Sequence, residues 1–307
     1  MEGILPLWKE KGMTSHDCVY KLRKILKTKK VGHSGTLDPN VEGVLPVCIG
    51  KATKLIEYLM ESGKIYEGEI TLGFSTTTED SDGDIIEQKE VPNLLKESEI
   101  DKVMEGFVGE IIQTPPMYSA VKVNGKRLYQ YARAGEQVER PTRKAAIYEY
   151  KRTSSLRYND LDKTLSWDFE VSCGKGTYVR TLAVDTGKKL GYPAHMSNLI
   201  RTSSGGFSSE QCLSLDQLKN MDFEQLNTVL YPLEWGVRDF PQVNLTDELW
   251  IKVKDGSVME KSVVPDGTNF PCAFFYKNQV VSIYADHPSK SGKIKPLKMI
   301  RNSLNEE

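Results

Sequence analysis

The chain is poor in cysteine and histidine and shows no metal-binding spacing. Its five cysteines lie far apart, at positions 18, 48, 173, 212 and 272, and its four histidines form no HExxH pair. An odd, scattered set of cysteines argues against a disulfide framework, and without CxxC or HExxH patterns the common zinc sites are excluded. We therefore expect a protein of the reducing cytoplasm that binds no metal.

Long apolar runs and the common nucleotide-binding and hydrolase motifs are also missing. No stretch reaches the roughly 18 apolar residues that a membrane-spanning helix needs, and the N-terminus "MEGILPLWKE" shows no secretory signal. The sequence contains no P-loop, no GxGxxG fingerprint and no GxSxG nucleophile elbow. These absences disfavour membrane proteins, P-loop enzymes, dinucleotide-dependent oxidoreductases and α/β-hydrolases.

Acidic residues are absent from one segment and concentrated in another. The net charge is −1, but residues 18–37 carry six Lys and Arg and no acid, whereas residues 79–110 carry eleven acids and three lysines. This polarity predicts one face that attracts phosphates and another that stays solvated. We expect the acidic segment to lie on the surface, away from any polyanionic ligand.

Hydrophobic periodicity predicts helices and strands in no regular alternation. A capping box at 14–17 predicts a helix that continues to about Lys30. Residues 64–75 and 164–173 alternate between apolar and polar positions, as half-buried strands do. An Asn-Gly pair at 124–125 predicts a hairpin turn. Strands and helices interspersed without a βαβ rhythm favour an α+β fold over a doubly wound sheet.

The last part of the chain differs in character from the rest. It contains short β-like runs such as "CAFFYKNQVVSIY", with a polar turn at Lys277 and Asn278. We predict a main domain over residues 1–240 and a small β-rich domain over residues 241–307.

One short segment concentrates the candidate chemistry. In "VGHSGTLDPN", Asp38 is the first acid after twenty residues without one, and it follows glycines that permit close approach to a ligand. An aspartate before proline often only caps its own turn. Asp38 could otherwise bind a metal with His33, act with Glu42 as a glycosidase pair, or perform covalent or acid–base chemistry on a nucleotide.

Four motifs in order carry a family resemblance that covers roughly residues 3–240. The segment "GHSGTLDPNVEGVLPVCIGKATK" closely resembles the central motif of the tRNA pseudouridine synthase B (TruB) family, bacterial relatives of the Cbf5/dyskerin enzymes. "KIYEGEITLGFSTTTEDSDG", "PPMYSAVKVNGKRLYQYARAG" and "CGKGTYVRTLAVDTGKKLG" are similar to the next three. The tail is similar to the family's small PUA-like domain. The N-terminus departs from the usual Asp-Lys-Pro order, with Trp8 and Glu10 beside Lys9.

The resemblance implies a fold, a reaction and a substrate. The fold is a pseudouridine synthase catalytic domain on a mainly antiparallel mixed sheet, followed by the PUA-like domain. The family isomerises the T-loop uridine of tRNA conventionally numbered 55: the flipped uracil is detached from C1′, rotated and rejoined through C5. Isomerisation needs no cofactor and no metal. We expect a cytoplasmic, monomeric enzyme that binds the tRNA T stem-loop, with no membrane and no obligate protein partner.

The resemblance assigns the chemistry to Asp38 and Arg180. Asp38 matches the essential aspartate, which would attack ribose C1′ or uracil C6, or take the C2′ proton; the sequence leaves these routes open. Arg180, in "GTYVR", matches the arginine that pairs with this aspartate. Because an adjacent cation lowers the pKa of a carboxylate, we expect a lowered pKa for Asp38.

Four further residues match positions that contact the substrate in the family. Tyr66 matches the tyrosine that stacks on the target uracil, and Tyr178 matches a second tyrosine near the base. Leu199 matches a position whose backbone contacts the uracil edge, and His33 matches the histidine that fills the gap left by the flipped base. We expect the RNA backbone to be held by the cations Lys21, Lys24, Lys27, Lys29, Lys30, Lys122, Lys126 and Arg127.

Two other functions fit parts of the sequence. A non-catalytic tRNA-folding or RNA-chaperone protein would use the same basic and aromatic surface without requiring Asp38. A nucleoside or glycoside hydrolase acting through Asp38 and Glu42 would release free base or sugar. The isomerase releases neither, which separates the alternatives.

Overall fold

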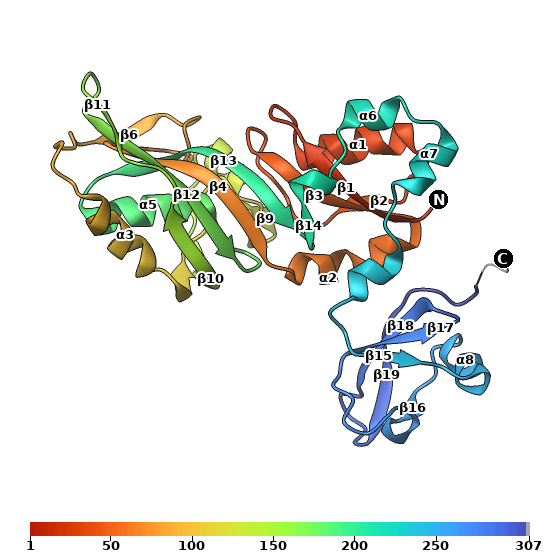
Figure 1. The fold of residues 1–307 in the computed structure, drawn as a ribbon. Helices are drawn as coiled ribbons and strands as arrows, with labels where there is room; N and C mark the ends of the chain where they lie inside the picture. The colour runs from red at the N-terminus through yellow and green to blue at the C-terminus, as the bar shows by residue number, and fades with distance from the viewer. Residues whose placement is uncertain (305–307) are drawn as a thin grey trace.

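A ten-stranded sheet runs through the main body of the protein in a computed structural model that describes residues 1–304 (Figure 1). Its strands are β1 (Gly3–Lys9), β2 (Val31–His33), β3 (Glu42–Ile49), β4 (Lys64–Leu72), β7 (Gly109–Gln113), β10 (Arg143–Arg152), β11 (Arg157–Asn159), β12 (Thr164–Cys173), β13 (Ala194–Ser204) and β14 (Phe207–Ser208). Seven of them follow the order β1-β3-β13-β4-β12-β10-β7, while β2 pairs with β3, β11 with β12 and β14 with β13.

Besides the strands of its sheets, the chain contains helices and two small hairpins. The α-helices are α1 (Ser15–Ile25), α2 (Ile56–Glu61), α3 (Glu97–Glu105), α4 (Leu128–Ala134), α5 (Val179–Leu190), α6 (Leu215–Lys219), α7 (Phe223–Thr228) and α8 (Asp247–Val253). The 3-10 helices are η1 (Gly50–Leu55), η2 (Ser209–Gln211), η3 (Leu233–Val237) and η4 (Lys261–Val263). The hairpins are β5 (Phe74–Thr76) with β6 (Ile85–Gln88), and β8 (Lys122–Val123) with β9 (Lys126–Arg127).

Within residues 1–304, one pair of strands in the large sheet is parallel and the others are antiparallel. β3 and β13 run parallel where Arg201 lies opposite Gly43. The prediction of an α+β fold on a mainly antiparallel mixed sheet is therefore confirmed. Gly43 has a φ of 129°, and a Cβ there would lie 2.2 Å from the Arg201 carbonyl oxygen. Only glycine lets the two halves of the sheet join this closely.

Two helices pack on the half of the sheet that contains β10 and β12. α3 and α5 contact each other, and they contact β10 and β13 respectively (Figure 1). The inward side chains of β12, Trp167, Phe169 and Val171, are buried in the same core as side chains of α5. The predicted strand at 164–173 is therefore confirmed, and its buried face anchors the helix that will carry a site residue.

α1 packs on the other half of the sheet and begins where the sequence predicts. Its stripe of Cys18, Val19 and Leu22 shares a core with β1, β3, α6 and α7. The Asp17 amide donates a hydrogen bond to the Thr14 hydroxyl at 3.0 Å, and the Thr14 amide donates to the Asp17 carboxylate at 2.9 Å. The predicted capping box is confirmed.

The predicted end of this helix is wrong, because α1 stops at Ile25 rather than near Lys30. Lys27 adopts a φ of 48°, and the Thr28 amide donates to the Arg23 carbonyl at 3.2 Å, the hydrogen bond of a Schellman C-cap. Glycine usually occupies this left-handed position and marks the helix end in a sequence. Here a lysine occupies it, so the signal is missing.

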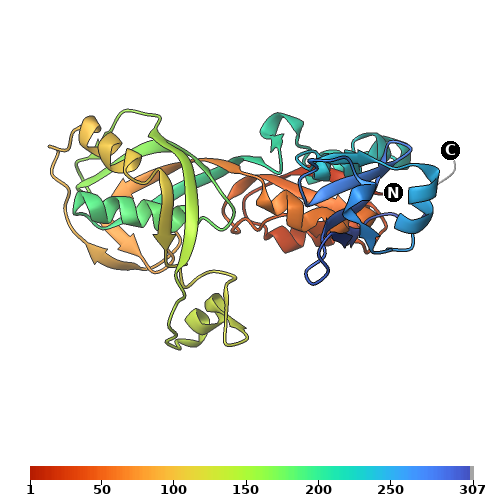
Figure 2. The ribbon, with the colours of Figure 1, turned by 90° about the horizontal axis from the view of Figure 1, so that it is seen from below.

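The segment between β7 and β10 projects from the body as a separate lobe (Figure 2). We call residues 114–142 the thumb. It contains the β8–β9 hairpin and α4. Asn124 and Gly125, both at positive φ, form the predicted hairpin turn.

Five strands near the C-terminus form a second, smaller sheet in the order β15-β17-β18-β19-β16. They are β15 (Gln242–Asn244), β16 (Met259–Glu260), β17 (Cys272–Tyr276), β18 (Gln279–Asp286) and β19 (Lys293–Met299). Lys277 and Asn278, both at positive φ, form the turn predicted between β17 and β18. The prediction of a small β-rich part at the C-terminus is confirmed.

A shared core and a partly buried ion pair fix the C-terminal sheet to the main body. Phe275 of β17 belongs to the same apolar cluster as Ile4 of β1. Glu234 of η3 accepts hydrogen bonds from the Arg301 guanidinium at 2.9 Å and from the Val280 amide at 2.8 Å. The two sheets are therefore held together by contacts from both sides of the junction.

Replacement of Gly43 by alanine is expected to destabilise the fold by about 3 kcal/mol or more, because the new methyl group would meet the Arg201 backbone at an unfavourable φ. Gly191→Ala is the control: its φ is 85°, but a Cβ there meets nothing within 4 Å, so a loss of about 1 kcal/mol is expected. Urea unfolding measures both variants. Equal losses of stability in the two variants would contradict the conclusion that the close approach of β3 and β13 requires glycine at position 43.

Candidate active site

Asp38 lies in the loop between β2 and β3, and side chains from β1 and α1 hold this loop in place. The buried ammonium group of Lys9 donates hydrogen bonds to the carbonyl oxygens of Pro39 at 3.0 Å and Val41 at 2.7 Å. The hydroxyl of Ser15 accepts a hydrogen bond at 2.9 Å from the backbone amide of Leu37, the residue before Asp38. The carboxylate is thus presented by a loop that is tied down on both sides.

Arg180, in the first turn of α5, joins Asp38 to two other segments of the chain. Its Nη2 lies 2.9 Å from Oδ2 of Asp38. The same guanidinium donates hydrogen bonds to the carbonyl oxygens of Thr78 at 2.7 Å and Tyr118 at 2.9 Å, and Asp80 lies 3.8 Å away. Its side chain is only 6 % exposed. The structure therefore brings together the two residues that the sequence motifs pair.

The net pKa shift of Asp38 is upward, opposite to the expectation from its arginine neighbour. Removal from water is the largest cause and raises the pKa of Asp38, whereas Arg180 acts in the other direction and Asp80 adds to the rise. The side chain remains 42 % exposed, so a ligand can still reach the carboxylate. The fold therefore holds an accessible carboxylate that ionises less readily than an aspartate in water.

Tyr66 and Leu199 lie on the adjacent strands β4 and β13, in the same apolar core as Leu37. Tyr66 is 8 % exposed, and burial raises its pKa, so that its hydroxyl stays protonated at neutral pH. Arg201, which is opposite Tyr66 in the strand register, and Asp38 are among the charges that act on this hydroxyl. Tyr66 is therefore both a core residue and a neighbour of the Asp38 loop.

His33 and Tyr178 approach from β2 and from the N-cap of α5. Burial lowers the pKa of His33, and its Nδ1 has no hydrogen-bond partner among the described residues. The backbone of Tyr178 exchanges two hydrogen bonds with the Gln113 side chain, and the Arg143 guanidinium lies 5.4 Å from its ring centre. Neither side chain hydrogen-bonds to Asp38 within residues 1–304, so the structure does not connect either of them directly to the Asp38–Arg180 pair.

Two buried cations, which the sequence motifs do not single out, help to organise the site. Lys9 lies within the apolar strand β1, and burial lowers its pKa. Arg201 is 1 % exposed and donates hydrogen bonds to the carbonyl oxygens of Val44 at 2.8 Å and Gly35 at 3.2 Å. The sequence offers a signal for both residues, because each is a charged residue next to apolar residues: a lysine in "ILPLWKE" and an arginine in "SNLIRT". A charged side chain that is buried usually has a partner, so such positions indicate a polar contact inside the fold.

The expectation that the acidic segment lies away from the site is wrong for its first part. The carboxylate of Asp82 accepts a hydrogen bond at 2.6 Å from the side-chain amide of Asn40, two residues beyond Asp38. Together with Asp80 beside Arg180, this contact places the β5–β6 loop against the Asp38 loop. The attraction between Arg180 and Asp80, together with the hydrogen bond between Asn40 and Asp82, explains why the start of the acidic run lies here.

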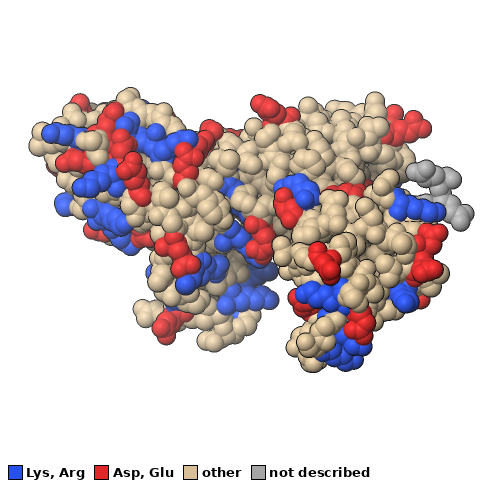
Figure 3. Space-filling model, turned by 60° about the horizontal axis from the view of Figure 1, so that its bottom comes forward, with Lys and Arg blue, Asp and Glu red and all other residues tan. Residues whose placement is uncertain are grey.

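The cations expected to hold RNA differ in how freely they can do so. The ion pairs found within residues 1–304 include none of the six Lys and Arg between positions 21 and 30. On the thumb, Lys126 is paired with Glu136 at 2.8 Å. Figure 3 shows Lys and Arg mixed with Asp and Glu over the visible face rather than one uniform basic surface. An RNA that binds on this face must therefore be held by local clusters of cations.

The described residues offer no obvious metal site. Within residues 1–304, no group of three or more His, Cys, Asp or Glu could hold a metal ion. The acidic run at 80–84, which resembles the start of a calcium loop, instead contacts Thr78, Arg180 and Asn40. Each helix within residues 1–304 is too short or too polar to cross a membrane.

Asp38→Asn is expected to unfold at the same or a higher urea concentration than the wild type at pH 7. Burial raises the pKa of Asp38 in the folded state, so ionisation of this carboxyl weakens the fold. The difference should vanish below the ordinary carboxyl value of 3.8, where both states are protonated. Asp160→Asn, at a side chain that is 86 % exposed, should change nothing. A large loss in Asp38→Asn at pH 7 would mean that the Arg180 pair outweighs burial.

Two family models match the chain. One, described as "TruB family pseudouridylate synthase (N terminal domain)", covers residues 23–179. The other, described as "tRNA pseudouridylate synthase B C-terminal domain", covers residues 180–238. The Asp38 loop and the thumb fall within the first match, and Arg180 is the first residue of the second.

Relatives match over nearly the whole length. Proteins named "tRNA pseudouridine synthase B" from Halalkalibacterium halodurans and Listeria monocytogenes are 52 % and 51 % identical to this chain, and each match covers 98 % of both sequences. Among solved structures, "Crystal Structure of a Cbf5-Nop10-Gar1 Complex" contains a similar chain, with 28 % identity and a TM-score of 0.73 over 97 % of this chain and 85 % of that one. Since the family models and these full-length relatives agree, this chain belongs to the TruB family of pseudouridine synthases.

Proposed function

We propose that this chain isomerises a uridine of tRNA to pseudouridine. The Asp38–Arg180 pair carries the proposal, because segments from three parts of the chain hold it at 2.9 Å while the carboxylate stays exposed. Relatives that share about half of the sequence bear the name tRNA pseudouridine synthase B. We assign the target to the T-loop uridine conventionally numbered 55, as the resemblance of the motif around Asp38 implies.

The ionised carboxylate of Asp38 is the reacting group in this proposal. It attacks C1′ or C6 of the flipped nucleotide, or it removes the C2′ proton, and each route needs the unprotonated form. Arg180 offsets part of the unfavourable free energy of burying this charge. A raised pKa also makes the carboxylate a stronger base than an exposed aspartate would be.

Four residues position the flipped nucleotide in this proposal. Tyr66 stacks on the uracil with its protonated hydroxyl towards C5, supported by its fixed place in the core. Tyr178 contacts the base from the start of α5, and the backbone at Leu199 contacts the uracil edge. His33, whose pKa is lowered by burial, places a neutral ring in the gap that the flipped base leaves.

The proposal divides the chain into two parts with different tasks. Residues 1–240 form the catalytic domain, and residues 241–307 form a PUA-like domain that binds RNA. The second sheet begins at β15, and the matched family models end at residue 238, which supports this division. We further propose a monomer that acts on the T stem-loop in the cytoplasm without an obligate protein partner.

The catalytic role of Asp38 is tested on an unmodified T stem-loop RNA with a pseudouridine-specific chemical label. The wild type should convert one loop uridine, and Asp38→Asn should be slower by roughly 10²- to 10⁴-fold or more, with RNA affinity retained. Glu42→Gln is the control, since Glu42 lies 4.0 Å from Lys11 and has no reacting role here.

Three outcomes would contradict the proposal. Unchanged conversion by Asp38→Asn would remove Asp38 from the chemistry. RNA binding without conversion by the wild type would favour the RNA-chaperone function. Release of free uracil or sugar would indicate a hydrolase. Loss of activity in Glu42→Gln would then support a hydrolase that acts through both Asp38 and Glu42.

The acid limb of the kcat/KM profile is expected to lie above the ordinary carboxyl value of 3.8, because burial raises the pKa of Asp38. Activity should therefore fall as the pH drops through this raised value. Asp80→Asn removes a negative charge that contributes to the rise, so its limb should move to lower pH. Initial rates at RNA concentrations well below KM, measured across the pH range, give both profiles; a wild-type limb at or below 3.8 would contradict the assignment.

A further inference from the structure

A basic hollow at the C-terminal end of α1 takes no part in the site described above. It has a volume of about 670 Å³ and is lined by Tyr20, Arg23, Lys24, Lys27, Thr28 and Lys29. The sequence has no acid between Asp17 and Asp38, and the ion pairs found within residues 1–304 include none of these cations. The hollow therefore carries concentrated positive charge that the protein does not neutralise.

Lys27 occupies a position in this hollow that favours glycine. Its φ of 48° is the left-handed conformation of the helix C-cap, which disfavours residues with a Cβ. A glycine here would keep the same cap with less strain. The lysine therefore adds charge to the hollow at the expense of backbone stability.

Tyr20 and Arg23 give the hollow further features of an RNA site. Tyr20 is 55 % exposed, and Nζ of Lys24 lies 4.5 Å from its ring centre. Nε of Arg23 is buried and has no hydrogen-bond partner among the described residues, although Nη2 donates to the Val31 carbonyl at 3.2 Å. Unpaired cations beside an exposed ring suit RNA, because the cations bind phosphates and the ring can stack on a base.

The hollow lies at the far end of α1 from the reacting carboxylate. Ser15, the first residue of α1, hydrogen-bonds to Leu37 beside Asp38. α1 has 11 residues, so its two ends are about 16 Å apart. An RNA with one loop nucleotide at Asp38 can therefore reach the hollow only with a different part of its backbone.

Further lysines extend the basic surface from the hollow towards the C-terminal sheet. Lys30 directly follows the hollow, and Lys30, Lys51 and Lys298 all act electrostatically on Lys54. Lys298 belongs to β19, and both it and Lys51 also pair with a glutamate. Cations from the main body and the C-terminal sheet are therefore neighbours. Such a surface suits a large folded polyanion better than a short hairpin.

We propose that the hollow at the end of α1 binds backbone phosphates of tRNA outside the T stem and loop. The inference rests on the proposed function, because it takes tRNA as the ligand. The contact raises affinity for folded, full-length tRNA without touching the reacting uridine. Lys24, Lys27 and Lys29 bind the phosphates, and Tyr20 offers a stacking surface for an adjacent base.

Lys27→Gly tests this contact without weakening the fold. Glycine removes the charge and relieves the left-handed strain, so the melting temperature should stay the same or rise. The Kd for full-length tRNA should increase about threefold to tenfold, and the slope of log affinity against log salt should fall by about 1. Binding to an isolated T stem-loop hairpin should lose less affinity than binding to full-length tRNA, because the hairpin lacks the phosphates proposed to reach the hollow.

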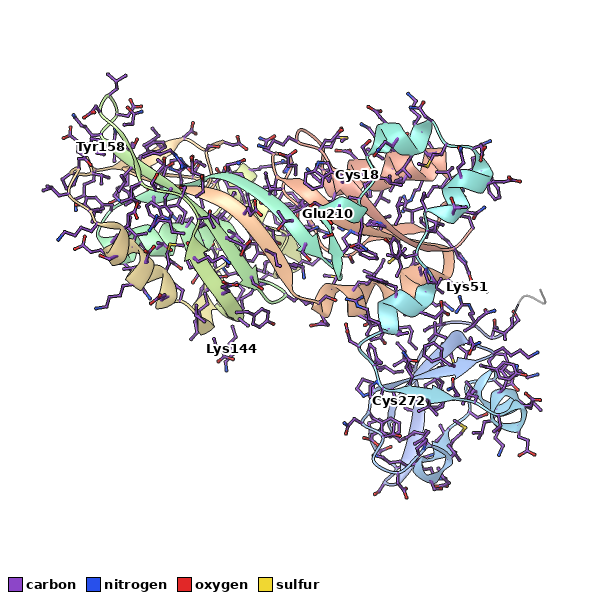
Figure 4. The ribbon with its side chains drawn as sticks, in the orientation of Figure 1. Cys18, Lys51, Lys144, Tyr158, Glu210 and Cys272 are labelled. Carbon is purple, nitrogen blue, oxygen red and sulfur yellow. The ribbon has the colours of Figure 1, made fainter. Side chains whose placement is uncertain are left out.

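Lys163→Gly is the matched control. Lys163 also has a positive φ, 54°, and its ammonium lies 3.8 Å from Asp160 in the turn between β11 and β12. Figure 4 places Tyr158 of β11 at the opposite end of the main body from Cys18 of α1. The control makes the same amino-acid change and the same charge change far from the hollow, so tRNA affinity should not alter.

A Lys24→Ala, Lys29→Ala double variant should weaken full-length tRNA binding further and lower the salt slope by about 2. The proposal is overturned if Lys27→Gly binds full-length tRNA like the wild type, if the hairpin loses affinity equally, or if Lys163→Gly has the same effect. If the wild type forms no pseudouridine in the hairpin, the proposed function fails, whereas the comparison of tRNA affinities still decides the phosphate contact.

Discussion

A guanidinium buried in the first turn of α5 requires three irregular segments of chain to converge. An uncompensated charge in a protein interior is strongly unfavourable, and Arg180 is almost fully enclosed. Carbonyl groups of Thr78 and Tyr118 and the carboxylate of Asp38 satisfy it from the β5–β6 loop, the base of the thumb and the loop after β2. The position of the proposed reacting group is therefore set by Arg180 on α5 together with the hydrogen bonds that Lys9 and Ser15 make with the loop that carries this group.

The loop that carries Asp38 has positive side chains on one side and negative side chains on the other. Lys9 and Arg201 lie buried behind it and bind its backbone carbonyls, while Asp80 and Asp82 lie beside it and contact Arg180 and Asn40. Asp38 therefore experiences attraction from its cation and repulsion from a neighbouring carboxylate, in addition to burial. The result is a carboxylate with a raised pKa that still keeps a charged partner.

Much of the fold could be predicted from the sequence, because its signals are local. The capping box that starts α1, the alternation of β12 and the Asn-Gly turn of the thumb each depend on residues within a few positions of one another. The end of α1 could not be predicted, since Lys27 adopts a conformation normally marked by glycine. Nor could the upward pKa shift of Asp38 or the approach of Asp80, because both depend on segments brought together only by folding.

The shared core beneath the C-terminal sheet limits how this architecture can change during evolution. Phe275 lies in one apolar cluster with Ile4, and Arg301 neutralises Glu234 from across the junction. A chain that lost its last strands would expose this apolar surface to water and leave a partly buried carboxylate without its cation. The tail is therefore not a module that recombination could exchange freely. Any replacement would have to supply both a matching apolar face and a cation at the same point.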